Sequence, residues 1–130
     1  MNTRIIMASS AVVLAAIGIG LMFLPEETLA YLNIGTSKSL LLILQLLGGL
    51  YFGFAMLNWM SQWSLIGGIY NKPVSVANFA QFFIGGMALI KDMTSNPEMP
   101  GVFWIIAVVY IVYAAIFGWL FYNQPASKDI

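Results

Sequence analysis

The sequence predicts an all-α integral membrane fold, a four-helix bundle with a short interfacial helix after the first span. Of its 130 residues, 61% are hydrophobic and only 8% are charged, whereas soluble domains carry about 25% charged residues. Four apolar stretches also each approach the ~20 residues that a helix needs to cross a bilayer. We therefore expect a single four-span membrane domain over residues 1–130, with spans at about 4–24, 38–60, 73–90 and 101–122.

The first span ends at Pro25, because a proline disfavours helical geometry in the residue before it. Its apolar run is about 20 residues long, which exceeds the ~7–15 residues of a signal-peptide core, so we expect it to be retained. Pro25, Glu26 and Glu27 then favour a new helix, with proline at the first position and acids at the positive end of the dipole. We expect this short helix to lie on the membrane surface and to end at Gly35.

Lys72 separates the second span from the third, since it is the only charge between Ser39 and Ile90. Pro73, which follows it, suits the first position of a helix. The fourth span begins after Pro97 and Pro100. These breaks complete the four-span plan.

The cations in the short loops predict the orientation. In a four-span plan Arg4, Lys72 and Lys128 fall on one side of the membrane, and Lys38 and Lys91 fall on the other. Because Lys and Arg are enriched in cytoplasmic loops, we predict that both termini are cytoplasmic.

Several classes of function are disfavoured by what the chain lacks. It has no Cys and no His, which excludes disulfides, thiolate or imidazole metal sites and Ser-His-Asp catalysis. No carboxylate lies inside a predicted span, whereas a proton-coupled pump is expected to carry one. The net charge is zero, so nothing points to nucleic acid. We expect no catalytic residue, no cofactor and no metal.

Small residues mark candidate packing positions in the spans. Gly49 and Gly53 form a G-x-x-x-G motif in the second span, and Gly85 lies in the third. Small residues at this spacing let helix backbones approach closely in lipid. The motif is compatible with packing inside one bundle and with the seam of a homodimer.

Four polar residues in the second and third spans form a candidate ligand pocket: Tyr51, Asn58, Asn78 and Gln81. An amide in hydrocarbon needs a hydrogen-bond partner, so these side chains should face inward. They are expected either to bond one helix to another or to line a pocket that opens toward the cytoplasmic side. Neutral amides and phenols orient a ligand but are poor acid–base catalysts near neutral pH.

The overall plan resembles the small four-span bacterial membrane proteins of the DoxX-like group. The resemblance covers nearly the whole chain and is carried by Phe23-Leu24-Pro25-Glu26, Gln45-Leu46-Leu47-Gly48-Gly49, Leu57-Asn58-Trp59, Gly67-Gly68-Ile69-Tyr70-Asn71-Lys72-Pro73 and Asn78. It implies the four-span fold in a bacterial inner membrane. It implies no catalytic residue, because the roles within that group are diverse.

These observations favour a non-enzymatic integral membrane protein. We expect it to bind a lipid-like or small apolar ligand between helices, or to serve as an accessory subunit of a larger membrane partner. The alternative is a small oligomeric transporter or channel, formed by a homodimer or larger assembly. A membrane enzyme acting on a lipid or quinone ranks last, because acid–base groups are missing from the spans.

Overall fold

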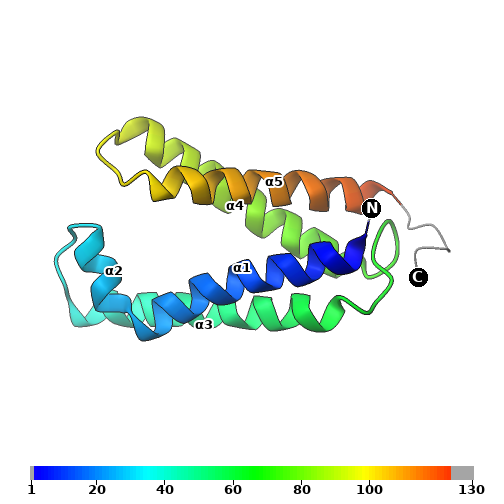
Figure 1. Ribbon diagram of the computed structural model, residues 1–130, viewed down its shortest axis with the longest axis horizontal. Helices are drawn as coiled ribbons and strands as arrows, with labels where there is room; N and C mark the ends of the chain where they lie inside the picture. Colours follow the sequence, from blue (N-terminus) through cyan, green and yellow to red (C-terminus); the bar gives the residue numbers. More distant parts are fainter. Residues whose placement is uncertain (1, 124–130) are drawn as a thin grey trace. The chain divides into compact units, whose positions relative to one another are not determined.

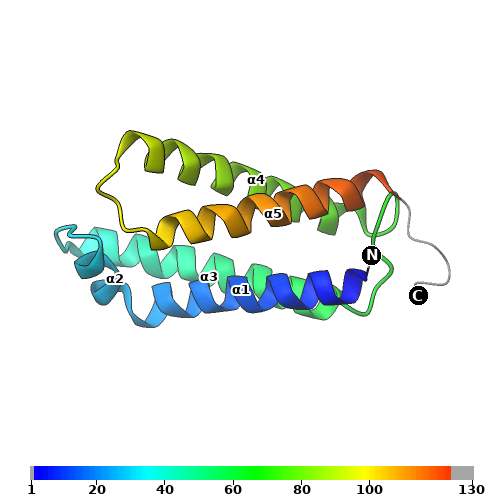
Figure 2. The same ribbon diagram turned by 45° about the horizontal axis from the view of Figure 1, so that its top comes forward.

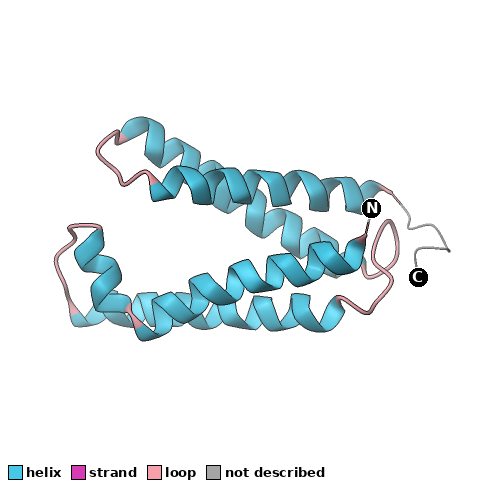
Figure 3. Ribbon diagram, in the orientation of Figure 1, coloured by secondary structure: helices cyan, strands magenta, loops and turns pink. Residues whose placement is uncertain are grey.

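The computed structural model describes residues 2–123, and within that range every regular element is a helix (Figures 1 and 3). In chain order the helices are α1 (Thr3–Phe23), α2 (Pro25–Tyr31), α3 (Lys38–Ser61), α4 (Lys72–Ser95) and α5 (Val102–Tyr122). All but α2 are long and apolar enough to cross a membrane. The predicted all-α class, with four long apolar helices and a short one after the first, is confirmed and indicates a multi-pass membrane protein. Lys128 lies outside the described residues.

Side-chain caps fix the starts of two long helices. The Asn2 side chain accepts hydrogen bonds from the backbone N–H groups of Arg4 and Ile5 at the start of α1. The hydroxyl oxygen of Ser37 accepts from the N–H of Leu40 at 3.1 Å at the start of α3. Both caps satisfy N–H groups that have no partner within the first turn of a helix.

The short helix α2 begins at Pro25 as predicted but ends earlier than expected. Its last residue is Tyr31, and the chain turns at Asn33, whose φ of 58° is left-handed. The N–H of Ile34 then donates to the carbonyl oxygen of Leu29 at 3.0 Å, which closes the helix end. Asparagine tolerates this conformation, so Gly35 is not needed for the stop.

Helix α4 is longer than the predicted third span. It continues to Ser95, five residues beyond the expected end at Ile90, so Lys91 and Asp92 belong to its last turns. The charges end the apolar run but do not end the helix. It stops before Pro97, which disfavours helical geometry in the preceding residue Asn96.

The helices form two compact units, which divide between Trp63 and Ser64. In the first unit α1 packs along α3 with α2 between them in sequence, and in the second α4 packs along α5. The two long helices of each pair run in opposite directions (Figure 2). Each unit is therefore built around one antiparallel helix pair.

The backbones of α1 and α3 touch where Gly18 meets Gly48. A Cβ atom added to Gly18 would lie 2.8 Å from the carbonyl oxygen of Gly48 and 2.9 Å from the backbone nitrogen of Phe52. A Cβ added to Gly48 would lie 2.8 Å from the carbonyl oxygen of Gly18. Both glycines are buried, so this pair sets how closely the two helices approach.

Aromatic rings fill the space between α4 and α5. The buried Phe82 ring stacks on Tyr113 and Phe117, with centroids 5.0 and 6.0 Å apart, and meets the edge of Tyr110 at 5.1 Å. Gly85 makes room for this packing, because a Cβ there would lie only 2.7 Å from the Tyr110 ring. Offset and edge-on ring contacts of this kind add stability beyond the buried area.

A tight turn leads from the first unit into α4. Gly67 and Gly68 have φ values of 142° and 55°, which residues other than glycine rarely adopt. The N–H of Gly68 donates to the carbonyl oxygen of Leu120 at 2.9 Å, which fixes the turn to the end of α5. Asn71 is also left-handed, and its amide donates to the carbonyl oxygen of Leu65 at 2.6 Å.

Candidate functional site

The four polar residues predicted to form a ligand pocket are divided between the two units. Tyr51 and Asn58 lie on α3 in the first unit, and Asn78 and Gln81 lie on α4 in the second. Within each unit the structure shows local hydrogen-bond partners for Asn58, Asn78 and Gln81. A pocket shared by all four residues stays a prediction.

Asn58 bonds α3 to α1. Its side chain is fully buried, and its amide nitrogen donates to the hydroxyl oxygen of Ser10 at 3.0 Å. Ser10 is also fully buried, and its hydroxyl donates to the carbonyl oxygen of Met7 at 2.9 Å. In the first unit Asn58 therefore serves helix pairing, the first of its two expected roles.

Asn78 and Gln81 lie one turn apart on α4. The Asn78 amide donates to the carbonyl oxygen of Val74, one turn earlier in the helix, at 2.9 Å. The Gln81 amide nitrogen donates to the hydroxyl oxygen of Tyr110 on α5 at 3.3 Å. Its Oε1 atom is buried and has no hydrogen-bond partner within residues 2–123, so Gln81 retains an acceptor for a donor group.

The glycines predicted for helix packing differ in what surrounds them. A Cβ added to Gly49 or Gly53 would meet no heavy atom within 4 Å, and both residues are exposed on α3. The neighbouring Gly48 is the one that contacts α1. Gly85 lies against the Tyr110 ring in the second unit. Within the first unit, α1 therefore packs on α3 through Gly48 and not through Gly49 or Gly53.

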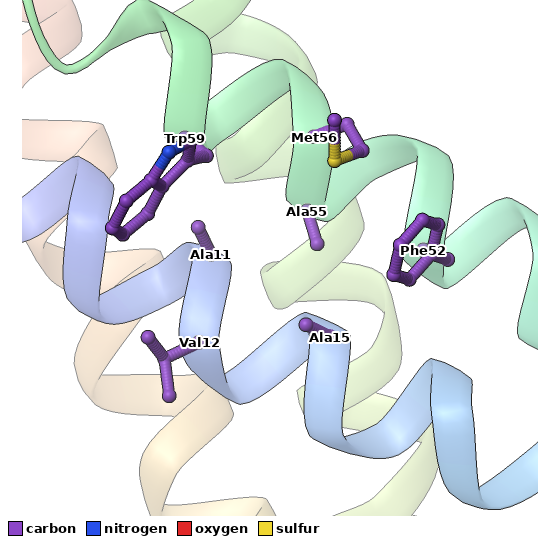
Figure 4. Close-up of a pocket in the computed structure, with 7 residues that line it drawn as sticks. All are labelled: Ala11, Val12, Ala15, Phe52, Ala55, Met56 and Trp59. Atoms are coloured by element: carbon purple, nitrogen blue, oxygen red, sulfur yellow. The ribbon is translucent and has the colours of Figure 1, made fainter.

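An apolar groove runs along the seam of α1 and α3 (Figure 4). Small side chains, Ala11 and Ala15 from α1 and Ala55 from α3, lie between the helices (Figure 4). Trp59 stands at one end of the groove and Phe52 at the other (Figure 4). The remaining lining residues are Val12 and Met56.

The size and chemistry of this groove restrict what it holds. Its volume is about 240 Å³, below the ~300–1,000 Å³ of pockets that enclose whole drug-sized ligands. Phe52 and Trp59 are seven residues apart, which is ~10 Å along a helix and about a third of the ~30 Å hydrocarbon core. All of its lining side chains are apolar apart from the indole N–H of Trp59. It suits one segment of a hydrocarbon chain.

Sequence reasoning did not identify this groove. Its walls belong to two helices separated by some forty residues of chain, and no local pattern reports which faces meet. One signal was present: Ala11 and Ala15 lie on one face of the first span together with Gly18. Trp59 lies near the end of the second span, where tryptophan usually serves as an anchor at the membrane interface.

No protein-family model, curated protein or solved structure matches this chain. The resemblance to the DoxX-like group therefore stays a prediction. The function has to follow from the chain's own residues.

Proposed function

We propose that this protein is a non-enzymatic membrane protein that binds a lipid-like or small apolar ligand between helices α1 and α3. The groove lined by the alanines and by Phe52, Met56 and Trp59 carries the proposal. The side of the groove lined by Val12 and Met56 is exposed, since these side chains are 60% and 46% exposed. A ligand therefore has access from the side.

The physical reason for binding is packing. In lipid there is no hydrophobic force that drives apolar surfaces together, so association depends on dispersion contacts and on shape. Lipid tails that fill the groove loosely make fewer of these contacts than a chain that fits it closely. A bound linear hydrocarbon segment would therefore gain contacts, with the flat Trp59 ring at one end.

We propose the inner membrane of a bacterium as the location, with both termini cytoplasmic. Arg4, at the start of α1, and Lys72, at the start of α4, support this orientation. In that orientation the Trp59 end of the groove lies toward the cytoplasmic leaflet. Tagging either terminus with a reporter that is active only in the cytoplasm tests the orientation.

Native mass spectrometry of the full chain released from membranes tests ligand binding. Wild-type protein is expected to retain a lipid-like molecule, and Val12→Phe is expected to lose it because the new ring occupies the groove. Val108→Phe is the matched control, since Val12 and Val108 are both 60% exposed and Val108 lies on α5. Equal retention by the two variants would contradict the proposal.

A small oligomeric transporter or channel is the second candidate. The open faces of Gly49 and Gly53 favour it, together with Gln45, which lies one turn earlier on α3 and is also exposed. An amide facing hydrocarbon is costly, and a second copy of the chain would supply a partner. Native mass spectrometry would then show oligomers that Gly49→Leu disrupts, and protein in liposomes would support flux.

An accessory role would appear in the same spectra as a larger membrane protein bound in fixed ratio. Wild-type monomers that carry lipid and no partner would favour ligand binding over both other functions. A monomer with neither lipid nor partner would contradict all three functions.

A further inference from the structure

Arg4 lies on the same face of α1 as the floor of the groove. Ala11 and Ala15 are seven and eleven residues after it, close to two and three helical turns. Arg4 therefore stands in line with the groove, ~10 Å further along the helix axis than Ala11. The Trp59 end of the groove faces in its direction, because α1 and α3 are antiparallel (Figure 2).

The Arg4 side chain is held in place by an aromatic ring. Its guanidinium carbon lies 3.7 Å from the centroid of Trp63, which follows Trp59 by four residues just past the end of α3. Stacking uses the flat face of a guanidinium and leaves its N–H edge free to donate. Arg4 forms no ion pair within residues 2–123, so its charge is available to an anion.

We propose that the groove and Arg4 together bind one phospholipid, with an acyl chain in the groove and the phosphate at Arg4. This inference rests on the proposed function, since it names the class of lipid that the groove accepts. The order of groups along the seam matches the molecule: hydrocarbon at Phe52 and the alanines, then the indole of Trp59, then a cation. Arginine suits phosphate because its fork of donors binds two oxygens at once.

The geometry favours a lipid over the other occupants of an apolar groove. A transmembrane helix from a partner, about 10–12 Å across with its side chains, would cover the groove with a few side chains and would place no anion at Arg4. A free phosphate would use Arg4 alone and leave the groove empty. Only a molecule with both a chain and an anionic head uses both features.

Lys72 offers a matched comparison for Arg4. It also begins a long helix next to an aromatic ring, with its ammonium 5.2 Å from the Phe121 centroid, and it belongs to the second unit. Removing its charge changes the protein's net charge by the same amount as removing that of Arg4. A loss of lipid preference that occurs in Arg4→Gln and not in Lys72→Gln is therefore due to the position of Arg4 beside the groove.

The test measures lipid retention by the purified full chain in native mass spectra, with three added probes: dioleoylphosphatidylglycerol, dioleoylglycerol and glycerol phosphate. Wild-type protein and Lys72→Gln are expected to retain the phospholipid at least about tenfold better than dioleoylglycerol, because a single charge-assisted hydrogen bond already supplies that factor. Arg4→Gln should abolish that preference, and Arg4→Lys should keep part of it. Glycerol phosphate should not be retained.

The outcomes separate this inference from the proposed function. If Val12→Phe removes both lipids while Arg4→Gln keeps the preference for phosphate, the groove binds a chain and the phosphate site is wrong. If Val12→Phe and Arg4→Gln both behave as wild type, both proposals fail. If glycerol phosphate were retained as strongly as the phospholipid, Arg4 would bind anions without help from the groove, and the phospholipid proposal would be wrong.

Discussion

The contact between Gly18 and Gly48 makes a sharp prediction for Gly48→Ala. The added methyl group would lie 2.8 Å from the carbonyl oxygen of Gly18 and 2.9 Å from the backbone nitrogen of Met22. Backbone atoms cannot rotate away as a side chain can, so α1 and α3 must move apart. The variant should therefore be less stable than wild type.

The size of the effect follows from the distances. Ordinary contact begins near 3.4 Å, so a 2.8 Å approach requires the helices to separate by about 0.6 Å. Overpacking of this kind costs about 1–3 kcal/mol. Alanine recovers up to about 1 kcal/mol through its higher helix propensity. The net loss in the free energy of unfolding should fall between about 0 and 3 kcal/mol, centred near 1.5 kcal/mol.

Gly49→Ala is the control, because the same change there meets no heavy atom within 4 Å. It should leave stability unchanged or raise it by up to about 1 kcal/mol. The two variants should thus differ by about 2 kcal/mol, roughly thirtyfold in the unfolding equilibrium. Reversible unfolding in mixed micelles, followed by far-UV circular dichroism and tryptophan fluorescence, measures this difference.

Equal stability of Gly48→Ala and Gly49→Ala would refute the reasoning, because it would mean that the backbones of α1 and α3 are not in contact. Adding Gly18→Ala to Gly48→Ala provides a second check. Once the helices have separated, the second methyl group should cost less than it does alone. Strict additivity would indicate two unrelated sites.

Three further predictions use the same unfolding assay. Ser10→Ala and Asn58→Leu, made singly and together, should give a coupling free energy of about 0.6 kcal/mol, the average for hydrogen bonds between membrane helices; a value near zero would mean that this bond adds no stability. Gly85→Ala should cost about 1–3 kcal/mol, because its Cβ would lie 2.7 Å from the Tyr110 ring, and wild-type behaviour would contradict that packing. Phe82→Leu should cost about 1–2 kcal/mol through its lost ring contacts, and an unchanged transition would mean that the rings add little.

The helices were predictable because each is defined by signals close together in sequence. An apolar run shows where a span begins, and Pro25 shows where the first one ends. Helix α4 differs most from the predicted span, because the apolar run stops at Ile90 while the backbone stays helical to Ser95. The charged residues Lys91 and Asp92 end the apolar segment, but charged side chains do not interrupt helical backbone geometry.

The packing was less predictable, because it depends on which faces meet. Gly48 and Gly49 are adjacent and point about 100° apart around the helix, a consequence of 3.6 residues per turn. The spacing of Gly49 and Gly53 drew attention to one face, whereas α1 packs against Gly48. Nothing in the local sequence states which of the two glycines faces a partner.

The bond between Asn58 and Ser10 bears on how the chain enters the membrane during synthesis. Both residues belong to the first unit, which ends at Trp63, before α4 begins at Lys72. At ~5–20 residues per second, the ribosome needs several more seconds to complete α5. Asn58 can therefore leave the translocon with one amide N–H already bonded to a partner synthesised before it, which lowers the cost of carrying that amide into lipid.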